Sequence, residues 1–362
     1  MNRAGRIAAV AGVIIAVGLV AWAFRVASTA GLFTDVTPRF AGTCRTVRGI
    51  IGAEDIAVDR KTGLAFLSAT DRRAPEGHPD PQDGLYSFVP AHPELGVTRL
   101  TGTPKDFHPH GIGLWRGADG VLTLMAVNHR TNGTSTVDVF TVTETAKADG
   151  TISATLSETA SVGSSLFVRP NDVAPTGPDS FYVTNSHTST TAFGRFLETW
   201  LLVPRADVVY YDGQIPRIAA NGLRFANGVA LSPDGSKLYV AESLGRDIVT
   251  YDRQPVSGKL VETSRFAMSA GLDNIDIDAT GELWVAGHPK LFAFLAYQSD
   301  PAKPSPSEIF KVDMANGMPV AAHAVFTDLG SRIGAASVGV WAGGHLLIGS
   351  VFDPKFLDCT MR

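Results

Sequence analysis

One short pattern recurs six times along the chain and limits the folds that the chain can adopt. Each copy opens with small or polar residues, alternates apolar residues over a few positions, turns on Gly, Asp or Pro, and enters a second apolar stretch. Alternation with a period of two around such turns is typical of a β-hairpin. The copies begin at Glu54, His110, Asn171, Asn227, Asp273 and Ser337, roughly 46 to 64 residues apart. The chain therefore repeats one strand–turn–strand unit.

The intervals between the copies contain further strand-like stretches, such as residues 135–144 and 246–253. Four strands in each repeat of about 40–50 residues or a little more are the pattern of a β-propeller blade. Six copies predict an all-β, six-bladed β-propeller between Cys44 and Cys359. The chain is 44% apolar, which suffices for a large core, and no linker rich in Pro, Ser or Gly divides it. We expect one propeller domain over residues 31–362.

The first 30 residues read as a membrane-targeting segment. Arg3 and Arg6 precede an uncharged apolar run over residues 7–24, which Arg25 closes. That length approaches the ~20 residues that cross a bilayer and exceeds the roughly 7–15 apolar residues of a signal peptide. The pattern favours an uncleaved hydrophobic helix with a cytoplasmic N-terminus. Small residues near positions 23 and 30 leave cleavage and secretion as the alternative, and both readings predict export of the propeller.

The chain has two cysteines, Cys44 just after the leader and Cys359 near the end. Disulfides persist in the oxidising compartments that exported proteins reach. A bridge between these residues would close the propeller ring, although two separate thiols remain the alternative.

One stretch departs from the strand pattern. Within residues 191–209, the apolar side chains recur at helical spacing, which predicts a short amphipathic helix on one face of the propeller. These side chains are Phe193, Phe196, Leu197, Trp200 and Leu201. Packing on that face is the simplest role, and a lid or a membrane contact is the alternative.

The openings of the repeats predict a metal site. Inner strands of a propeller line its central channel, so equivalent positions of the repeats converge there. Five openings carry polar pairs or a polar residue with glycine, namely Glu54-Asp55, His110-Gly111, Asn171-Asp172, Asn227-Gly228 and Asp273-Asn274. Burying a carboxylate or an amide without a partner costs free energy. A cation bound by their oxygen atoms would provide the missing partner for both groups. Hard oxygen ligands favour Ca²⁺, whereas the alternative is that these residues only cap hairpins or hold water.

Three histidines lie where they could serve as acid or base near this metal. His110 opens the second repeat, His129 ends the same hairpin, and His288 ends the hairpin that Asp273 opens. Imidazole can take a proton from water near neutral pH. The remaining histidines have no such placement and are expected to be structural, namely His78, His92, His108, His187, His323 and His345.

Charge excludes one class of function. The formal net charge is −4 and no block of Lys and Arg occurs, whereas nucleic-acid binding relies on clustered cations. We therefore expect no nucleic-acid partner. The sequence pattern defines neither an oligomeric state nor a natural substrate.

The chain resembles the paraoxonases or arylesterases, a family of six-bladed propellers. The resemblance covers nearly all of the exported part and includes the two terminal cysteines. Its motifs, in order, are EDIAVD, PHGIGLW, VNH, NDVAPTGPDSFYVTN, FANGVALSPDGSKLYVAE, LDNIDIDATGELWVAGHP and LLIGSVF. The hydrophobic leader is similar to the retained leader common in that family.

The resemblance implies two calcium ions, one catalytic and one structural. The residues that match the catalytic calcium ligands are Glu54, Asn171, Asn227, Asp273 and Asn274. Those that match the structural ligands are Asp55, Asp172 and the backbone carbonyl of Ile112. His110 and His129 match a histidine dyad, and His288 matches a further active-site histidine.

The activity implied by the resemblance is calcium-dependent hydrolysis of lactones and aryl esters, with organophosphate hydrolysis in some members. A water activated by His110 would attack the carbonyl, and Asp273 is the alternative base. Gluconolactonases, which are related propellers, are a second function, and a non-catalytic calcium-stabilised binding propeller is a third. Residues 68–84 and 186–200 depart from the family pattern, so no substrate preference is carried over.

Overall fold

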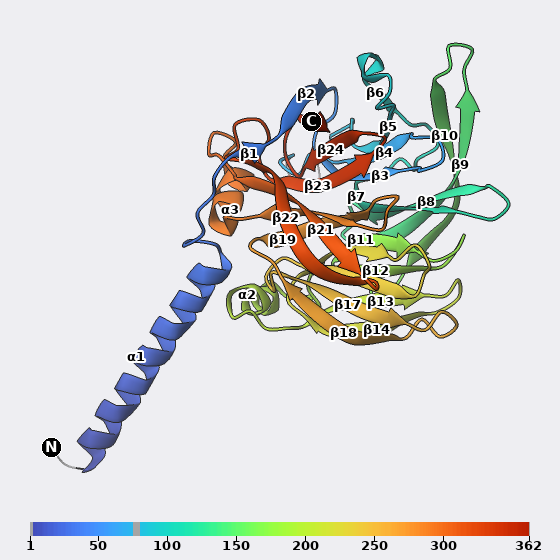
Figure 1. Cartoon of the computed structure of the whole chain (residues 1–362). Helices are drawn as coiled ribbons and strands as arrows, with labels where there is room; N and C mark the ends of the chain where they lie inside the picture. The colour runs from blue at the N-terminus through green and yellow to red at the C-terminus, as the bar shows by residue number, and fades with distance from the viewer. Residues whose placement is uncertain (1–2, 75–79, 362) are drawn as a thin grey trace.

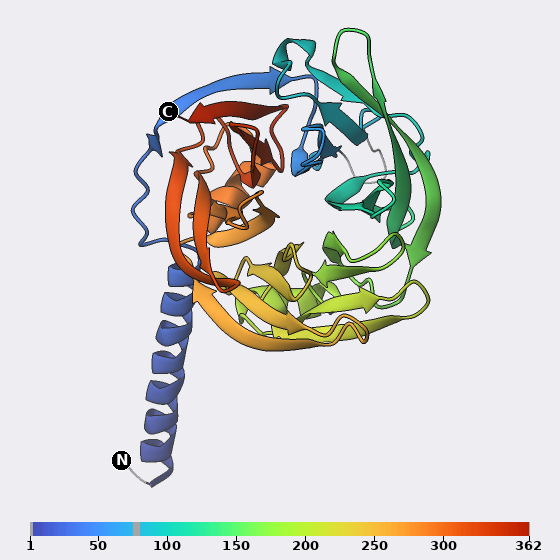
Figure 2. The ribbon, with the colours of Figure 1, turned by 45° about the vertical axis from the view of Figure 1, so that its right-hand side comes forward.

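A computed structural model describes residues 3–74 and 80–361 of the chain. Its strands form six antiparallel sheets arranged in a ring (Figure 2). Each sheet begins with a strand near the ring centre and ends with a strand at the rim, as in a propeller blade. The six-bladed β-propeller predicted from the repeats is therefore confirmed.

The first four blades each consist of four consecutive strands. Blade 1 comprises β3 (Ala53–Val58), β4 (Ala65–Ala69), β5 (Gly84–Phe88) and β6 (Val97–Arg99). Blade 2 comprises β7 (Pro109–Arg116), β8 (Leu122–His129), β9 (Ser135–Ala146) and β10 (Ile152–Gly163). Blade 3 comprises β11 (Pro170–Pro175), β12 (Phe181–Asn185), β13 (Ala206–Tyr211) and β14 (Pro216–Leu223). Blade 4 comprises β15 (Ala226–Leu231), β16 (Lys237–Glu242), β17 (Asp247–Arg253) and β18 (Leu260–Ala267).

The last two blades recruit strands from the N-terminal part of the chain, and this closes the ring. Blade 5 comprises β19 (Gly271–Ile277), β20 (Leu283–His288), β21 (Ser307–Ala315), β22 (Met318–Asp328) and the short β1 (Arg39–Phe40). Blade 6 comprises β23 (Ala336–Ala342), β24 (His345–Ser350), β25 (Lys355–Met361) and, at its rim, β2 (Gly42–Arg48).

The predicted disulfide joins Cys44 to Cys359, which face each other in the pairing of β2 with β25. The disulfide therefore reinforces a strand pairing that is seven residues long. The pairing of β2, the first long strand, with β25, the last strand, was not predicted from the sequence.

The core consists of apolar layers between neighbouring blades. Alternate residues of a strand point to opposite faces of its sheet, so each blade contributes to two layers. On β20, Trp284 packs against blade 6 and the next residue, Val285, packs against blade 4. On β4, Phe66 faces blade 2 and Leu67 faces blade 6. The period-two pattern of the sequence thus produces contacts on both faces of each blade and holds the ring together.

Three α-helices and one short 3-10 helix (Pro93–Leu95) accompany the strands in the described residues (Figure 1). Helix α1 (Arg3–Thr29) projects away from the propeller, and its segment Ala9–Thr29 is long and apolar enough to span a membrane. Helix α2 (Ala192–Trp200) begins after Thr191, whose side chain accepts a bond from the Gly194 amide. Helix α3 (Leu291–Ser299) was not predicted, because its residues are apolar nearly all round.

The predicted helix over residues 191–209 is wrong in its second half. The helix ends at Trp200, and strand β13 begins at Ala206. Leu202 has a positive φ of 55°, which ends the helical path, and Pro204 cannot donate the backbone bond that a helix requires. Trp200 stacks on Phe292 of α3 with ring centroids 6.3 Å apart, so the two short helices lie side by side.

Candidate active site

The inner strand of every blade has a register irregularity near its beginning. In β3 it falls between Ala53 and Asp55, and in β19 between Leu272 and Ile275. A bulge of this kind releases consecutive side chains from strict alternation. The polar pairs that open the repeats lie at these irregularities, which is why both members of a pair face the interior of the ring.

Glycine allows the inner strands to approach each other at this level. A Cβ on Gly111 would lie 2.4 Å from the Cα of Asp172, and one on Gly228 would lie 2.6 Å from the Cα of Asn274. Any side chain in these two places would clash with neighbouring backbone. Blades 2 and 4 therefore carry glycine where blades 3 and 5 carry a polar residue.

Hydroxyl groups of neighbouring blades donate hydrogen bonds to the openings of the inner strands. Thr184 Oγ1 donates to the carbonyl of Asn227 over 2.6 Å, and Ser243 Oγ donates to that of Leu272 over 2.6 Å. Ser337 of blade 6 donates to the carbonyl of Glu54 over 2.6 Å. Thr184 and Ser243 were not predicted from the sequence, although a Ser or Thr recurs near the end of the second strand in several repeats.

The five residues predicted as catalytic calcium ligands are all buried at the beginnings of inner strands. Four of their oxygen atoms make no hydrogen bond to any described residue. The amide nitrogen of Asn274 donates to Glu54 Oε1 over 3.0 Å, and that of Asn227 donates to Ser243 Oγ over 3.0 Å. The atoms without a hydrogen bond are Glu54 Oε2, Asn171 Oδ1, Asn227 Oδ1 and Asn274 Oδ1. Glu54 Oε2 has a distant ion-pair partner, Arg72 Nη2, at 3.9 Å.

These atoms fit a hard divalent cation. A buried oxygen without a partner costs about 1–3 kcal/mol, and four of them in one region leave a need that a cation would meet. Oxygen donors from carboxylate and amide groups are the ligands of Ca²⁺. Within the described residues, no group of three or more His, Cys, Asp or Glu forms a metal site. The oxygen set here depends on asparagine instead.

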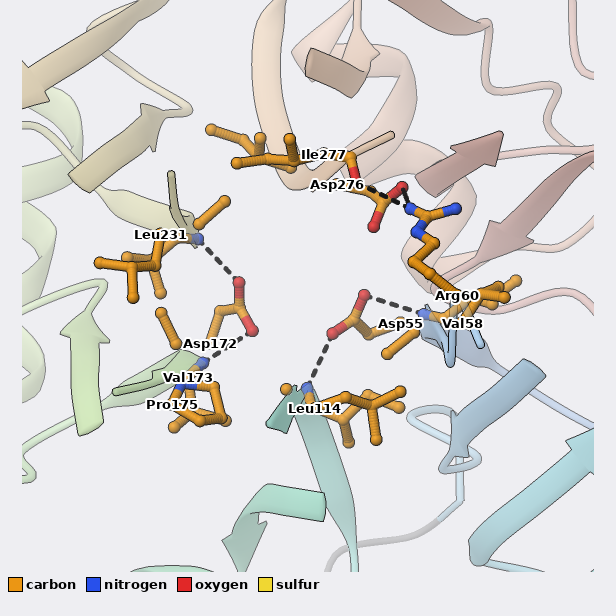
Figure 3. Close-up of a pocket in the computed structure, with 18 of the residues that line it drawn as sticks. Asp55, Val58, Arg60, Leu114, Asp172, Val173, Pro175, Leu231, Asp276 and Ile277 are labelled. Atoms are coloured by element: carbon orange, nitrogen blue, oxygen red, sulfur yellow. Dashed lines mark hydrogen bonds and ion pairs between the residues drawn. The ribbon is translucent and has the colours of Figure 1, made fainter. Parts of the chain in front are cut away.

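A second pair of carboxylates lies further along the channel. Asp55 accepts the amides of Ile56 and Ile112, over 2.8 and 2.7 Å. Asp172 accepts the amides of Val173 and Val229, both over 2.7 Å. Figure 3 shows the two carboxylates pointing into a cavity of about 440 Å³. Each carboxylate therefore ties two neighbouring blades together, and its oxygens keep a second lone pair for another ligand.

Burial and mutual repulsion disfavour the charges on these groups. Burial raises the pKa of Asp55 well above its usual range, and the neighbouring charges of Asp172 and Glu54 raise it further. Burial likewise raises the pKa of Asp172 well above the usual range. Burial also acts on Glu54, but His110 and Arg72 outweigh it and lower the pKa of that carboxyl. Cations near the channel therefore decide which carboxylates ionise.

The histidines predicted as a dyad are in contact. His110 Nδ1 lies 3.0 Å from His129 Nε2, and His129 Nδ1 lies 3.0 Å from Ser135 Oγ. The other nitrogen of His110, Nε2, lies 3.5 Å from Glu54 Oε1. Burial lowers the pKa of His129 well below its usual value, and the charge of His110 lowers it further. His129 is therefore neutral near pH 7, and His110 lies between it and the oxygen set.

His288 ends β20 in blade 5, whereas the dyad belongs to blade 2, three blades away in the ring. Its Nε2 lies 2.8 Å from Asp273 Oδ2, and its Nδ1 has no hydrogen-bond partner among the described residues. Its ring packs on Phe294 of α3 at 4.4 Å between centroids. Helix α3 thus covers His288 with apolar surface.

The histidines expected to be structural fit that role where they are described. His108 bonds to Asp83 over 2.7 Å, His345 bonds to Asp358 over 2.7 Å, and His323 bonds to Asp313 at the surface. His92 lies near Glu94, and His187 lies 3.0 Å from Thr199 Oγ1. His78 lies outside the described residues.

Comparison with known proteins identifies the family of the chain. The chain is 31% identical to serum paraoxonase/arylesterase 1 of Rattus norvegicus over 91% of its own length and 92% of that protein. It is 30% identical to serum paraoxonase/arylesterase 2 of Homo sapiens, covering 88% of each.

Solved structures with the same fold include a luciferin-regenerating enzyme, at a TM-score of 0.53 and 14% identity, covering 88% of this chain and 95% of that one. Another is a glucose dehydrogenase, at a TM-score of 0.50 and 13% identity, covering 87% and 98%. At such low identity these two show the propeller fold alone. The arylesterase family model matches residues 80–361. With the match to whole paraoxonase/arylesterase sequences, this shows that the chain belongs to the arylesterase family.

Proposed function

We propose that the chain is a calcium-dependent hydrolase of lactones and aryl esters. The observation that carries the proposal is the set of four unpartnered buried oxygens beside the contact between His110 and His129. A binding propeller would need neither a histidine pair beside the oxygens nor a neutral His129. The relatives named as paraoxonases and arylesterases support an ester or lactone as the substrate.

Two calcium sites are part of the proposal. Glu54, Asn171, Asn227, Asp273 and Asn274 would hold the catalytic ion, whose positive charge would polarise the substrate carbonyl and stabilise the oxyanion. Asp55 and Asp172, with the carbonyl of Ile112, would hold the structural ion. The charge of that ion would offset the repulsion that disfavours ionisation of both aspartates.

His110 is the general base in this mechanism. Its Nε2 faces Glu54, so a water bound beside the oxygen set lies within its reach. Base action requires a lone pair on Nε2, so the proton of neutral His110 must be on Nδ1. That proton is donated to Nε2 of His129, and the Nδ1 proton of His129 is then donated to Ser135 Oγ. Because the Ser135 hydroxyl can accept this bond, the contact is compatible with the tautomer in which His110 can accept a proton.

Asp273 is assigned a different role. Its Oδ2 is engaged with His288 over 2.8 Å, which leaves Oδ1 for the metal. His288 orients this carboxylate and, with Phe294, keeps bulk water from one side of the site. Proton abstraction therefore falls to His110 in this proposal.

The N-terminal segment is proposed as an anchor that holds the propeller outside the cytoplasm, with residues 1–30 as the anchor and residues 31–362 as the hydrolase domain. Its apolar helix ends next to the propeller, where Trp22 Nε1 donates to the carbonyl of Trp200 over 2.8 Å. Exposed Phe193 and Phe196 of α2 lie on the same part of the molecule. The apolar surface of α2 would then face the membrane.

Lactone hydrolysis before and after calcium chelation tests the proposal. The panel comprises aliphatic γ- and δ-lactones and phenyl acetate, and thermal stability is followed in parallel. Activity that disappears with chelator and returns with Ca²⁺ is expected. A melting temperature that depends on calcium, with no hydrolysis of any panel member, would contradict the enzymatic role and favour a binding propeller.

A further inference from the structure

A second cavity, of about 760 Å³, lies between blades 2 and 3. It is formed by the start of β9, the segment between β10 and β11, and the residues that lead into α2. Its wall is rich in hydroxyl groups, and it contains two arginines, Arg169 and Arg195. We call it the Arg169–Arg195 pocket. Its volume is within the range of about 300–1,000 Å³ that is usual for small-molecule sites.

The positive charge of the pocket is not balanced within its wall. No carboxylate is present among the described residues that line it. The side chain of Arg169 is exposed to the pocket, and the neighbouring charge that acts on it is the like charge of Arg195. Arg195 donates through Nη1 to the carbonyl of Thr190 over 2.8 Å. Its remaining N–H groups, and the guanidinium of Arg169, make no ion pair with a described carboxylate.

The field of both arginines reaches neighbouring histidines. Burial, followed by the charges of Arg169 and Arg195, lowers the pKa of His187 to about 4. Arg169 also contributes to the low pKa of His129. Two guanidinium groups with free N–H donors in a hydroxyl-lined cavity form a suitable partner for an anion.

The pocket adjoins the candidate active site. Ser135 is part of its wall, and the Oγ atom of Ser135 contacts His129 Nδ1 over 3.0 Å. Only the His129 ring separates that atom from His110. On the other side, Arg169 precedes Asn171 of the oxygen set by two residues. A group bound in the pocket would therefore belong to a substrate whose reacting carbonyl lies over the oxygen set.

We propose that the Arg169–Arg195 pocket binds a carboxylate on the substrate, so that the preferred substrates are lactones or esters with an anionic side chain. The inference rests on the proposed function and adds the substrate class. Arg169 and Arg195 are specificity-determining residues in this proposal. They contact the side chain of the substrate and take no part in the reaction of its carbonyl.

The test compares two γ-lactones with side chains of equal length, one ending in a carboxylate and the other in a methyl group. For the wild-type protein, kcat/KM should be roughly 10-fold to 100-fold higher for the carboxylated lactone, the range expected for a charge-assisted contact. Arg169→Gln and the double variant Arg169→Gln/Arg195→Gln should lower this ratio, mainly through KM. Arg169 makes no side-chain hydrogen bond within the described chain, so the single variant should fold normally.

Arg48→Gln is the matched control. It removes the same charge from an exposed position on β2, and it should keep the wild-type ratio. Equal kcat/KM for both lactones, or a ratio that Arg169→Gln does not change, would overturn the inference and leave the proposed function intact.

If neither lactone is hydrolysed, the proposed function fails, and binding decides the inference separately. Calorimetric titration with glutarate should then give a measurable affinity for the wild-type protein that both pocket variants reduce. Equal affinity in the wild type and the double variant, or none in either, would overturn the pocket assignment.

Discussion

The side-chain amide of Asn274 donates to Oε1 of Glu54 over 3.0 Å, although 220 residues separate the two in the sequence. The same nitrogen lies 3.2 Å from the carbonyl of Glu54. These contacts join blade 5 to blade 1 past blade 6, and they aim the remaining oxygen of each side chain elsewhere. Glu54 Oε2 and Asn274 Oδ1 make no hydrogen bond and remain available to a further ligand.

Replacement of Asn274 tests the catalytic calcium site. Asn274→Ala removes one oxygen donor and the contact that orients Glu54, so the calcium concentration for half-maximal activity should rise roughly 10-fold to 100-fold. Calcium-dependent change in melting temperature gives the same midpoint without any substrate. Asn221→Ala, at an exposed position on β14, should leave both midpoints unchanged. A normal midpoint for Asn274→Ala would remove it from the ligand set.

His110→Gln tests the general base. The loss of proton abstraction should lower kcat by about 10²-fold to 10⁴-fold, whereas the calcium midpoint and the melting temperature should stay near wild-type values. His323→Gln, on the exposed part of β22, is the control for a histidine change as such. Hydrolysis by His110→Gln at the parent rate would refute the dyad assignment and favour Asp273.

The buried carboxyl group of Asp207 should make the free energy of unfolding depend on pH. Burial raises the pKa of this carboxyl to about 6, with a further contribution from Glu198. A raised folded-state pKa contributes stability that is complete below the unfolded pKa of about 3.9 and is lost as pH rises through about 6. Asp207→Asn should therefore be more stable than wild type above pH 6, on the order of 3 kcal/mol.

This difference should vanish near pH 4, and chemical denaturation at several pH values measures it. The exposed Asp179 provides the control, since Asp179→Asn should run parallel to the wild type. A constant difference between Asp207→Asn and wild type at all pH values would indicate that the titration of Asp207 is not its cause.

Loss of the disulfide should destabilise the ring. Cys44 and Cys359 are 315 residues apart, and closing long loops in the unfolded chain stabilises proteins by typically 2–4 kcal/mol. The double variant Cys44→Ser/Cys359→Ser should lose about that much in guanidinium unfolding, and reduced wild-type protein should match it. Unchanged stability would mean that the pairing of β2 with β25 closes the ring without covalent help.

Deletion of residues 1–27 tests the anchor. It removes most of α1 but keeps Ser28 and Ala30, whose carbonyls accept bonds from Arg246 and the Leu291 amide. The shortened protein should be recovered in the soluble fraction, whereas the full-length chain should remain in membranes after alkaline carbonate extraction. If the full-length chain instead yields a soluble, shortened protein whose N-terminus lies after residue 23 or 30, the segment is cleaved and the propeller is secreted.

Much of the oxygen set could be predicted because it belongs to a repeated position. Asp273 and Asn274 open a repeat, and the same place in other repeats carries similar oxygens, so the ring symmetry of a propeller brings them together. The repeat pattern placed His110 and His129 on one hairpin, whereas their pairing as a dyad was implied by the resemblance to the arylesterases; the structure brings the two rings into contact. Their function remains the prediction that the experiments above address.

Other parts of the site have no counterpart in the repeats. Arg169 and Arg195 lie in irregular connections of blades 2 and 3 and in α2, and Ser135 is the first residue of β9. Their proximity depends on how loops fold over the end of the ring. The position of strand β2 could not be predicted either, because no local sequence pattern indicates that it pairs with β25.

The sequence by itself determined the number of blades and the polar residues that open the inner strands, and it favoured a bridge between Cys44 and Cys359 that the structure confirms. This was possible because side-chain alternation and turn residues are local properties, and the same local pattern occurs in each repeat. Only the tertiary structure decided which oxygens lack partners, which strand closes blade 6, and that two arginines share a pocket beside the histidines. These features depend on contacts between residues far apart in the chain, whose energies appear only when the blades pack into a ring.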